Sequence, residues 1–198
     1  FQFVRNDDTH ATANRIVQNA QNDAVTGTGW GNPTTGTPGG CTAASGSWAG
    51  GIMRSWELST PGNARMKHCL RVGLDKPQLK QAATQAGTYQ WPAITSDGFW
   101  ATYAGSIKMG SLLAIPPTID ITTLGLPNAD ALALAWTLQN FGCYVVDKSG
   151  SGSGAFTLYA EIGAPAAIVN NLRAGLATIR SQLRLVTNNT ATTIGGKT

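Results

Sequence analysis

Hydrophobic and polar residues alternate most regularly between residues 65 and 74, where every second side chain is apolar or is a histidine. A period of two puts alternate side chains on opposite faces of a β-strand, so this segment predicts a half-buried strand. The face expected to point inward consists of Met66, His68, Leu70, Val72 and Leu74. A second strand is predicted over 51–58, and the turn Pro61-Gly62-Asn63 between the two permits an antiparallel hairpin.

One well-marked helix is predicted at about residues 127–141. Pro127 suits a first helical turn, Asn128 can cap the helix, and Gly142 stands where a left-handed C-terminal cap is expected. An apolar run, a glycine-rich turn and a returning apolar run come next. These segments predict a β-hairpin over 143–160, directly after the helix.

Shorter patterns predict the remaining elements. Alternation or an apolar run indicates each strand, and glycine, proline and small polar residues mark the loops. The predicted elements are strands at 1–5, 13–17, 107–115 and 183–186, an aromatic strand end at 89–92, a second, shorter helix at 165–175, a long surface loop at 26–51 and a polar C-terminal tail at 188–198.

Composition favours strands over helices. Only 12% of the residues are charged and there are two glutamates, Glu57 and Glu161, whereas long amphipathic helices normally carry Glu, Lys and Arg on their solvent faces. The 24 glycines suit strands and loops better. The sequence therefore predicts an all-β fold, an antiparallel β-sandwich with one main helix, as a single domain over residues 1–187.

The charge distribution argues against a nucleic-acid partner. The net charge is +4, but the basic residues are spread thinly rather than gathered into a footprint. The nearest approach to a cluster consists of Arg54, Arg65, Lys67 and Arg71. No apolar run reaches the ~18 residues of a membrane span. The chain begins with Phe1 and shows no signal peptide, which is typical of a fragment or a processed product.

The three cysteines are Cys41, Cys69 and Cys143. An odd count allows either one internal disulfide with one free thiol or three thiols, and the sequence leaves this open. No spacing of cysteine and histidine indicates a zinc site. We expect no metal and no cofactor.

Several motifs follow one another in a characteristic order from about Gly50 onward. They are GIMRSWEL at 51–58, MKHCLRV at 66–72, YQWPA at 89–93, IPP at 115–117, LGL at 124–126 and ALALAWTLQNFGCYVVD at 131–147. In this order they resemble a module of secreted bacterial proteins and of phage tail or spike proteins. The chain departs from the family's usual residues at Cys69, Phe141 and Cys143, which look like packing changes.

The resemblance implies a β-sandwich of jelly-roll type. It also implies an extracellular or virion surface protein, often one that faces polysaccharide. The motifs that carry the resemblance are short, and none of them is catalytic by itself.

His68 and Glu57 are the leading candidates for a polar site. Because His68 alternates with apolar residues, we predict that it is largely buried and hydrogen-bonded, with Glu57 as its candidate partner. A satisfied core histidine is the favoured interpretation. The functional alternative is a general base in a polysaccharide lyase or hydrolase. The residues that could assist such a base are Arg54, Arg71, Tyr89 and Tyr103.

Tryptophans beside loops are the candidates for ligand binding, because their flat apolar faces can stack on sugar rings. Those assigned to ligand binding are Trp30, Trp48 and Trp91, with Trp100 also beside a loop and with Trp56 and Trp136 assigned to the core. The few acids provide no evident glycosidase pair. The pair Asp7-Asp8 is typical of a turn.

Three functions remain open from the sequence. The first is a non-catalytic module that recognises polysaccharide on an extracellular or virion surface. The second is a lyase or hydrolase acting on an anionic glycan, and the third is a structural subunit of a virion or filament that assembles with copies of itself. Surface tryptophans without a Tyr, His and Arg cluster would favour the first.

Overall fold

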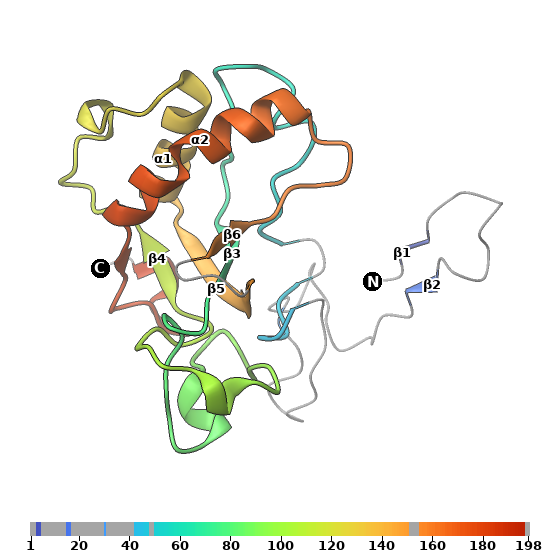
Figure 1. Cartoon of the computed structure of the whole chain (residues 1–198), viewed down its shortest axis with the longest axis vertical. Coiled ribbons are helices and arrows are strands. Elements are labelled where there is room, and N and C mark those ends of the chain that lie inside the picture. The colour runs from blue at the N-terminus through green and yellow to red at the C-terminus, as the bar shows by residue number, and fades with distance from the viewer. Residues whose placement is uncertain are drawn as a thin grey trace.

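The computed structural model describes residues 3–4, 15–16, 30, 42–47, 50–150 and 155–196, with the backbone alone at 3–4 and 15–16. Its core is a mixed sheet with the strand order β6-β3-β5-β4-β7, on which two helices pack together (Figure 1). The main elements are β3 (Leu70–Leu74), β4 (Leu112–Ala114), α1 (Ala129–Asn140), β5 (Cys143–Lys148), β6 (Phe156–Leu158), α2 (Ala166–Gln182) and β7 (Arg184–Leu185).

Shorter elements complete the described chain. Strands β1 (Phe3–Val4) and β2 (Arg15–Ile16) pair antiparallel, in agreement with the two short strands predicted there. The 3-10 helices are η1 (Gln85–Thr88), η2 (Trp100–Thr102), η3 (Ile121–Thr123) and η4 (Ile194–Gly196). Most of the loop predicted at 26–51 lies outside the described residues.

The prediction of an all-β, antiparallel sandwich of jelly-roll type is wrong. The fold is an α/β mixture in which helices cover one five-stranded sheet, and its central pair, β3 and β5, is parallel. The composition argument failed because α2 needs few charges on its solvent face. Exposed positions there are filled by small or neutral residues such as Ala167, Asn170 and Ser181. The short helix predicted at 165–175 consequently continues to Gln182.

The predicted hairpin over 143–160 is also wrong, because β3 lies between β5 and β6. Leu70 of β3 stands opposite Cys143 in the parallel pairing with β5, and Val72 stands opposite Leu158 in the antiparallel pairing with β6. Four of the five β3 residues are buried, which suits a strand at the centre of the sheet. β3 is buried between β5 and β6, so these two strands do not pair with each other as their nearness in sequence had predicted.

The strand predicted at 51–58 is a series of turns. Only Met53 makes a β-bridge, to Ala160, and the N–H groups of Glu57 and Leu58 both donate to the carbonyl of Arg54. The neighbouring prediction for 65–74 is confirmed only from Leu70 onward. The hairpin expected between these two segments therefore does not exist, and His68 precedes β3 rather than lying within it.

The helix predicted at about 127–141 is confirmed as α1. The side chain of Asn128 caps it by accepting a hydrogen bond from Ala131 N–H at 2.9 Å. Gly142 follows the helix with a φ of 68°, the left-handed conformation expected of a C-terminal glycine. The last predicted strand is confirmed as β7, and the strand predicted at 107–115 is confirmed over Leu112–Ala114. In the described residues, neither helix is long and apolar enough to cross a membrane.

A close contact between small residues joins the two helices. A Cβ added at Gly175 of α2 would lie 2.6 Å from the Cβ of Ala131 in α1, closer than real Cβ atoms approach one another. A buried polar link strengthens the same interface, because Asp130 accepts hydrogen bonds from Gly62 N–H and from the side chain of Asn171. Asp130 therefore links helix α1 both to helix α2 and to the loop that contains Gly62.

We predict that Gly175→Ala destabilises the protein by about 1–3 kcal/mol, because the added methyl group forces the helices apart. The opposing gain in helix propensity is about 1 kcal/mol. Urea unfolding measures the difference. The control is Gly98→Ala, where nothing lies within 4 Å of an added Cβ and the change should be within about 0.5 kcal/mol. Stability of Gly175→Ala equal to that of the wild type would contradict the close helix contact.

Candidate functional site

A surface groove of about 360 Å³ lies beside the segment that leads into β3. Its lining comes from two stretches of chain, and the lining residues are Gly50, Gly51, Ile52, Arg54, Trp56, Glu57, Lys67, His68 and Cys69. Gly51 holds the stretch 50–57 beside the stretch 67–69, because its carbonyl accepts a hydrogen bond from Arg71 N–H at 3.0 Å. An added Cβ at Gly51 would lie 2.8 Å from that nitrogen, and its φ is 75°, so glycine is required there.

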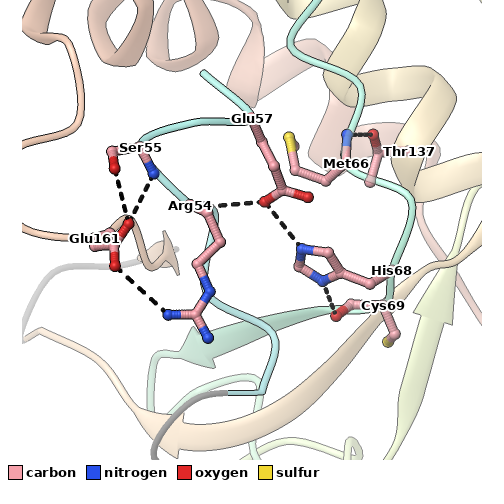
Figure 2. A network of polar contacts seen from close by, with 8 residues as sticks. All are labelled: Arg54, Ser55, Glu57, Met66, His68, Cys69, Thr137 and Glu161. Carbon is pink, nitrogen blue, oxygen red and sulfur yellow. Dashed lines mark hydrogen bonds and ion pairs between the residues drawn. The ribbon is translucent and has the colours of Figure 1, made fainter. Parts of the chain in front are cut away.

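The Glu57 carboxylate organises one wall of the groove. Its side chain is 5% exposed, and Oε2 accepts hydrogen bonds from Arg54 N–H at 2.9 Å and from His68 Nε2 at 3.1 Å (Figure 2). A buried carboxylate is tolerated only when such donors replace water. The bond to Arg54 closes the turn over 54–57, and the bond to His68 fastens this turn to the chain before β3.

Both ring nitrogens of His68 face oxygen acceptors. Nε2 meets the carboxylate of Glu57, and Nδ1 lies 3.0 Å from the carbonyl oxygen of Cys69. A carbonyl and a carboxylate can only accept hydrogen bonds, and these two contacts occupy both ring nitrogens. His68 therefore has no ring nitrogen directed at a substrate.

The hydrogen bond predicted between His68 and Glu57 is confirmed, but the predicted burial of His68 is wrong. Its side chain is 35% exposed, because the strand alternation on which the prediction rested begins only at Leu70. The neighbouring Met66 is buried, and its N–H donates to the hydroxyl of Thr137 in α1. Of the face predicted to point inward, Met66, Leu70, Val72 and Leu74 are buried, and His68 is the exception.

Glu161 joins the groove to the loop between β6 and α2. Its Oε2 accepts from both the N–H and the hydroxyl of Ser55 at 2.9 Å, and its Oε1 lies 3.6 Å from the Arg54 guanidinium (Figure 2). The backbone and side-chain hydrogen bonds from Ser55, aided by Arg54, lower the pKa of Glu161. Arg54 thus faces the groove with its charge already balanced by a carboxylate.

Trp56 departs furthest from the position that the strand pattern predicted for it. It was assigned to the core, yet it is 72% exposed at the groove, while Leu58 two residues later is fully buried. The turn over 54–57 breaks the strand alternation on which the assignment rested. The spacing of Arg54 and Glu57, followed by Pro61-Gly62, was the available sign of a turn, because a glutamate three residues along can reach back to a free N–H.

Of the tryptophans predicted to bind ligand, the two that the structure describes, Trp30 and Trp91, are less accessible than Trp56. Trp30 is half-buried and packs edge-on against Tyr144, with ring centroids 5.8 Å apart. Trp91 is half-buried and precedes a cis proline. Trp48 lies outside the described residues. Trp136, assigned to the core, is half-buried beneath the guanidinium of Arg65.

The residues proposed to assist a catalytic base do not gather around His68. Apart from Arg54, none of them lines the groove. Arg71 lies over the Tyr159 ring at 4.6 Å and donates to the carbonyl of Ser47. Tyr89 bridges to Met109. Tyr103 is buried and donates to Asp97 at 2.6 Å; burial and this bond raise the pKa of Tyr103.

Two of the three cysteines lie in the described part of the chain, and both are free thiols. Burial raises the pKa of Cys69 to about 12, against a smaller opposite effect of the Tyr144 backbone. Burial raises the pKa of Cys143 as well. The described residues hold no group of three histidine, cysteine or acidic side chains placed to bind a metal ion.

We predict that His68→Ala lowers the free energy of unfolding by about 1–3 kcal/mol, because it leaves the Glu57 carboxylate with one donor fewer. His68→Gln, which keeps an N–H donor, should recover part of the loss. In the double variant Glu57→Gln/His68→Ala the costs should not add, since the buried charge is gone. Urea unfolding of the wild type, the three single variants His68→Ala, His68→Gln and Glu57→Gln, and the double variant is the measurement, and a His68→Ala variant as stable as the wild type would refute the coupling.

We also predict that Cys69 reacts slowly with iodoacetamide in the folded protein. With a pKa of about 12, roughly one thiol in ten thousand is ionised at pH 8, and the thiolate is the nucleophile. Mass spectrometry of the Cys69 peptide follows its labelling separately from the other cysteines. Labelling in urea supplies the reference rate, and equal rates in folded and unfolded protein would contradict the buried position of the sulfur.

Comparisons with known proteins identified no relative of this chain. No protein-family model, no curated protein and no solved structure matches the chain. The resemblance of its motif order to secreted bacterial and phage tail modules therefore stays a prediction, and the case for function depends on the groove itself.

Proposed function

We propose that this chain is a non-catalytic module that recognises polysaccharide through the groove beside Trp56. The observation that carries the proposal is the 72% exposure of Trp56 at a groove of about 360 Å³ that polar side chains also line. Large aromatic residues are usually buried, and an exposed one beside a concave surface marks a binding site. The volume falls within the range of ~300–1,000 Å³ typical of small-molecule sites.

The chemistry of stacking fits a sugar. One face of a pyranose ring presents C–H groups, which pack against the flat apolar face of an indole, while the sugar hydroxyls need donors and acceptors around the edge. Arg54 and Lys67 line the groove together with Trp56 and bring polar groups to it. A single sugar unit can therefore meet an apolar surface and a polar rim together.

The polar contacts of the site support binding rather than catalysis. Both ring nitrogens of His68 are engaged in hydrogen bonds, one with Glu57 and one with the carbonyl of Cys69. Glu57 is 5% exposed and already accepts two hydrogen bonds. Glu161, the other acid nearby, is held by Ser55 and Arg54. A lyase or hydrolase needs a base or acid directed at the substrate, and neither glutamate has that freedom.

The arginine contacts support a largely neutral glycan over an anionic one. Arg54 pairs with Glu161, Arg65 lies over Trp136, and Arg71 lies over Tyr159, so the three do not converge on one ligand. Lys67 is the remaining cation of the lining, and it is exposed. Screening by salt should accordingly have little effect on affinity. The proposed setting, an extracellular or virion surface, follows the motif order from Gly51 to Asp147.

We predict that Trp56→Ala weakens binding to the preferred glycan by at least about fivefold, the loss of one stacking contact. A glycan array read at low and at high salt identifies that ligand, and titration calorimetry gives the affinities. Phe99→Ala is the matched control, since Phe99 is 58% exposed but does not line the groove. The control should bind as the wild type does.

Other outcomes would assign the chain differently. Steep weakening with salt would indicate an anionic glycan held by cations. Cleavage of a bound glycan would contradict the non-catalytic assignment. No binding to any glycan at either salt would overturn the proposal.

A further inference from the structure

A second hollow, separate from the groove, lies between β6 and α2. Its volume is about 270 Å³, and side chains from three elements form its walls: Leu134, Phe156, Leu158, Val169, Leu172 and Leu176. Leu134 and Leu172 at its base are buried, whereas Val169 and Leu176 at one side are partly exposed. The hollow is therefore an apolar cavity with an opening to solvent.

One short segment of chain contributes residues to both the cavity and the groove. Met53 contributes its side chain to the cavity, while its neighbours Ile52 and Arg54 line the groove. Hydrogen bonds from Met53 N–H to Tyr159 O at 3.0 Å and from Glu161 N–H to Met53 O at 2.9 Å fix this segment between them. A ligand in the cavity therefore does not occupy the proposed glycan site.

The chemistry of the walls defines the body of a ligand. Apart from Thr157 and Arg173 the lining is hydrocarbon or thioether, so hydroxyl-rich molecules would lose hydrogen bonds on entry. A well-enclosed apolar cavity of ~150 Å³ accommodates benzene, so this one has room for a longer apolar group. Because the i, i+3 and i+7 positions 169, 172 and 176 of α2 form one wall, an extended chain can lie along the helix.

Arg173 supplies the charge that defines the other end of the ligand. It lines the cavity on the exposed side of α2, and its guanidinium donates to the amide oxygen of Asn170 at 3.2 Å. Among the described residues no carboxylate forms an ion pair with Arg173. A guanidinium matches a carboxylate in shape and charge. An anionic group at the opening would complete its contacts.

We propose that this cavity binds an amphipathic carboxylate, with its apolar chain between β6 and α2 and its carboxylate against Arg173. A medium-chain fatty acid has this chemistry. The ligand is held mainly by burial of its chain, and Arg173 selects the charged end. This site is independent of the glycan proposal and stands if that proposal fails.

The probe is decanoate, titrated into the full chain by calorimetry. We expect a Kd below ~1 mM. Butyrate, with the same head group and a short chain, should bind at least about tenfold more weakly because it buries fewer methylenes. Decanol lacks the carboxylate, so its affinity should not depend on Arg173. A failure of decanoate to bind would overturn the proposal, as would equal affinities for decanoate and butyrate.

Two variants locate the site. Val169→Phe fills the cavity and should weaken decanoate binding at least about fivefold. Leu176→Phe repeats the test from the same wall if the first variant does not fold. Arg173→Gln should weaken decanoate about threefold to fivefold and leave decanol unchanged.

The control variant is Arg184→Gln. Arg184 is exposed and donates to the backbone carbonyl groups of Ser181 and Leu183, and it does not line the cavity. It should bind decanoate as the wild type does. Equal binding by the wild type and by both folded cavity-filling variants would place decanoate elsewhere and overturn the assignment. An unchanged affinity of Arg173→Gln would overturn the role of Arg173.

Discussion

A buried carboxylate is the constraint on which the groove depends. Glu57 is 5% exposed, and removing its charge from water is costly unless donors replace the lost hydration. The two donors are the Arg54 N–H and His68, so the turn over 54–57 and the chain before β3 must both hold their positions. The same turn sends Leu58 into the core and leaves Trp56 in solvent. The exposed indole is thus a consequence of how one charge is buried.

Local signals predicted some of the fold, and long-range pairing determined the rest. Helix α1 was predictable because Asn128 and Gly142 mark its ends by hydrogen bonding and backbone conformation that involve only neighbouring residues. The sheet was not, because β3 pairs with β5 and β6 across long stretches of chain. The alternation of apolar and polar residues predicts which face of a strand is buried, but it does not predict which strands pair with it. The low share of charged residues likewise failed to exclude α2, because small and neutral residues fill most of its solvent face and Arg173 is the exposed charge there.

The candidate site shows the same division. The partnership of Glu57 and His68 was predictable, since a histidine among apolar residues needs an acceptor and acids are scarce in this chain. The exposure of Trp56 was not, because it depends on a turn that interrupts an apparently regular strand pattern. Glu161 was missed altogether. It reaches Ser55 from 106 residues away, and no sequence spacing reports such a contact.

The central claim is that a glycan stacks on Trp56 and leaves Trp91 and Trp136 unaffected. The most direct test is to follow the indole N–H signals in ¹H–¹⁵N NMR spectra during titration with the oligosaccharide preferred on the array, with Trp56→Phe used to assign its signal. The account predicts a saturable shift of the Trp56 signal, with those of Trp91 and Trp136 unchanged. A shift confined to Trp91 or Trp136, or no shift at Trp56 under saturating ligand, would contradict it.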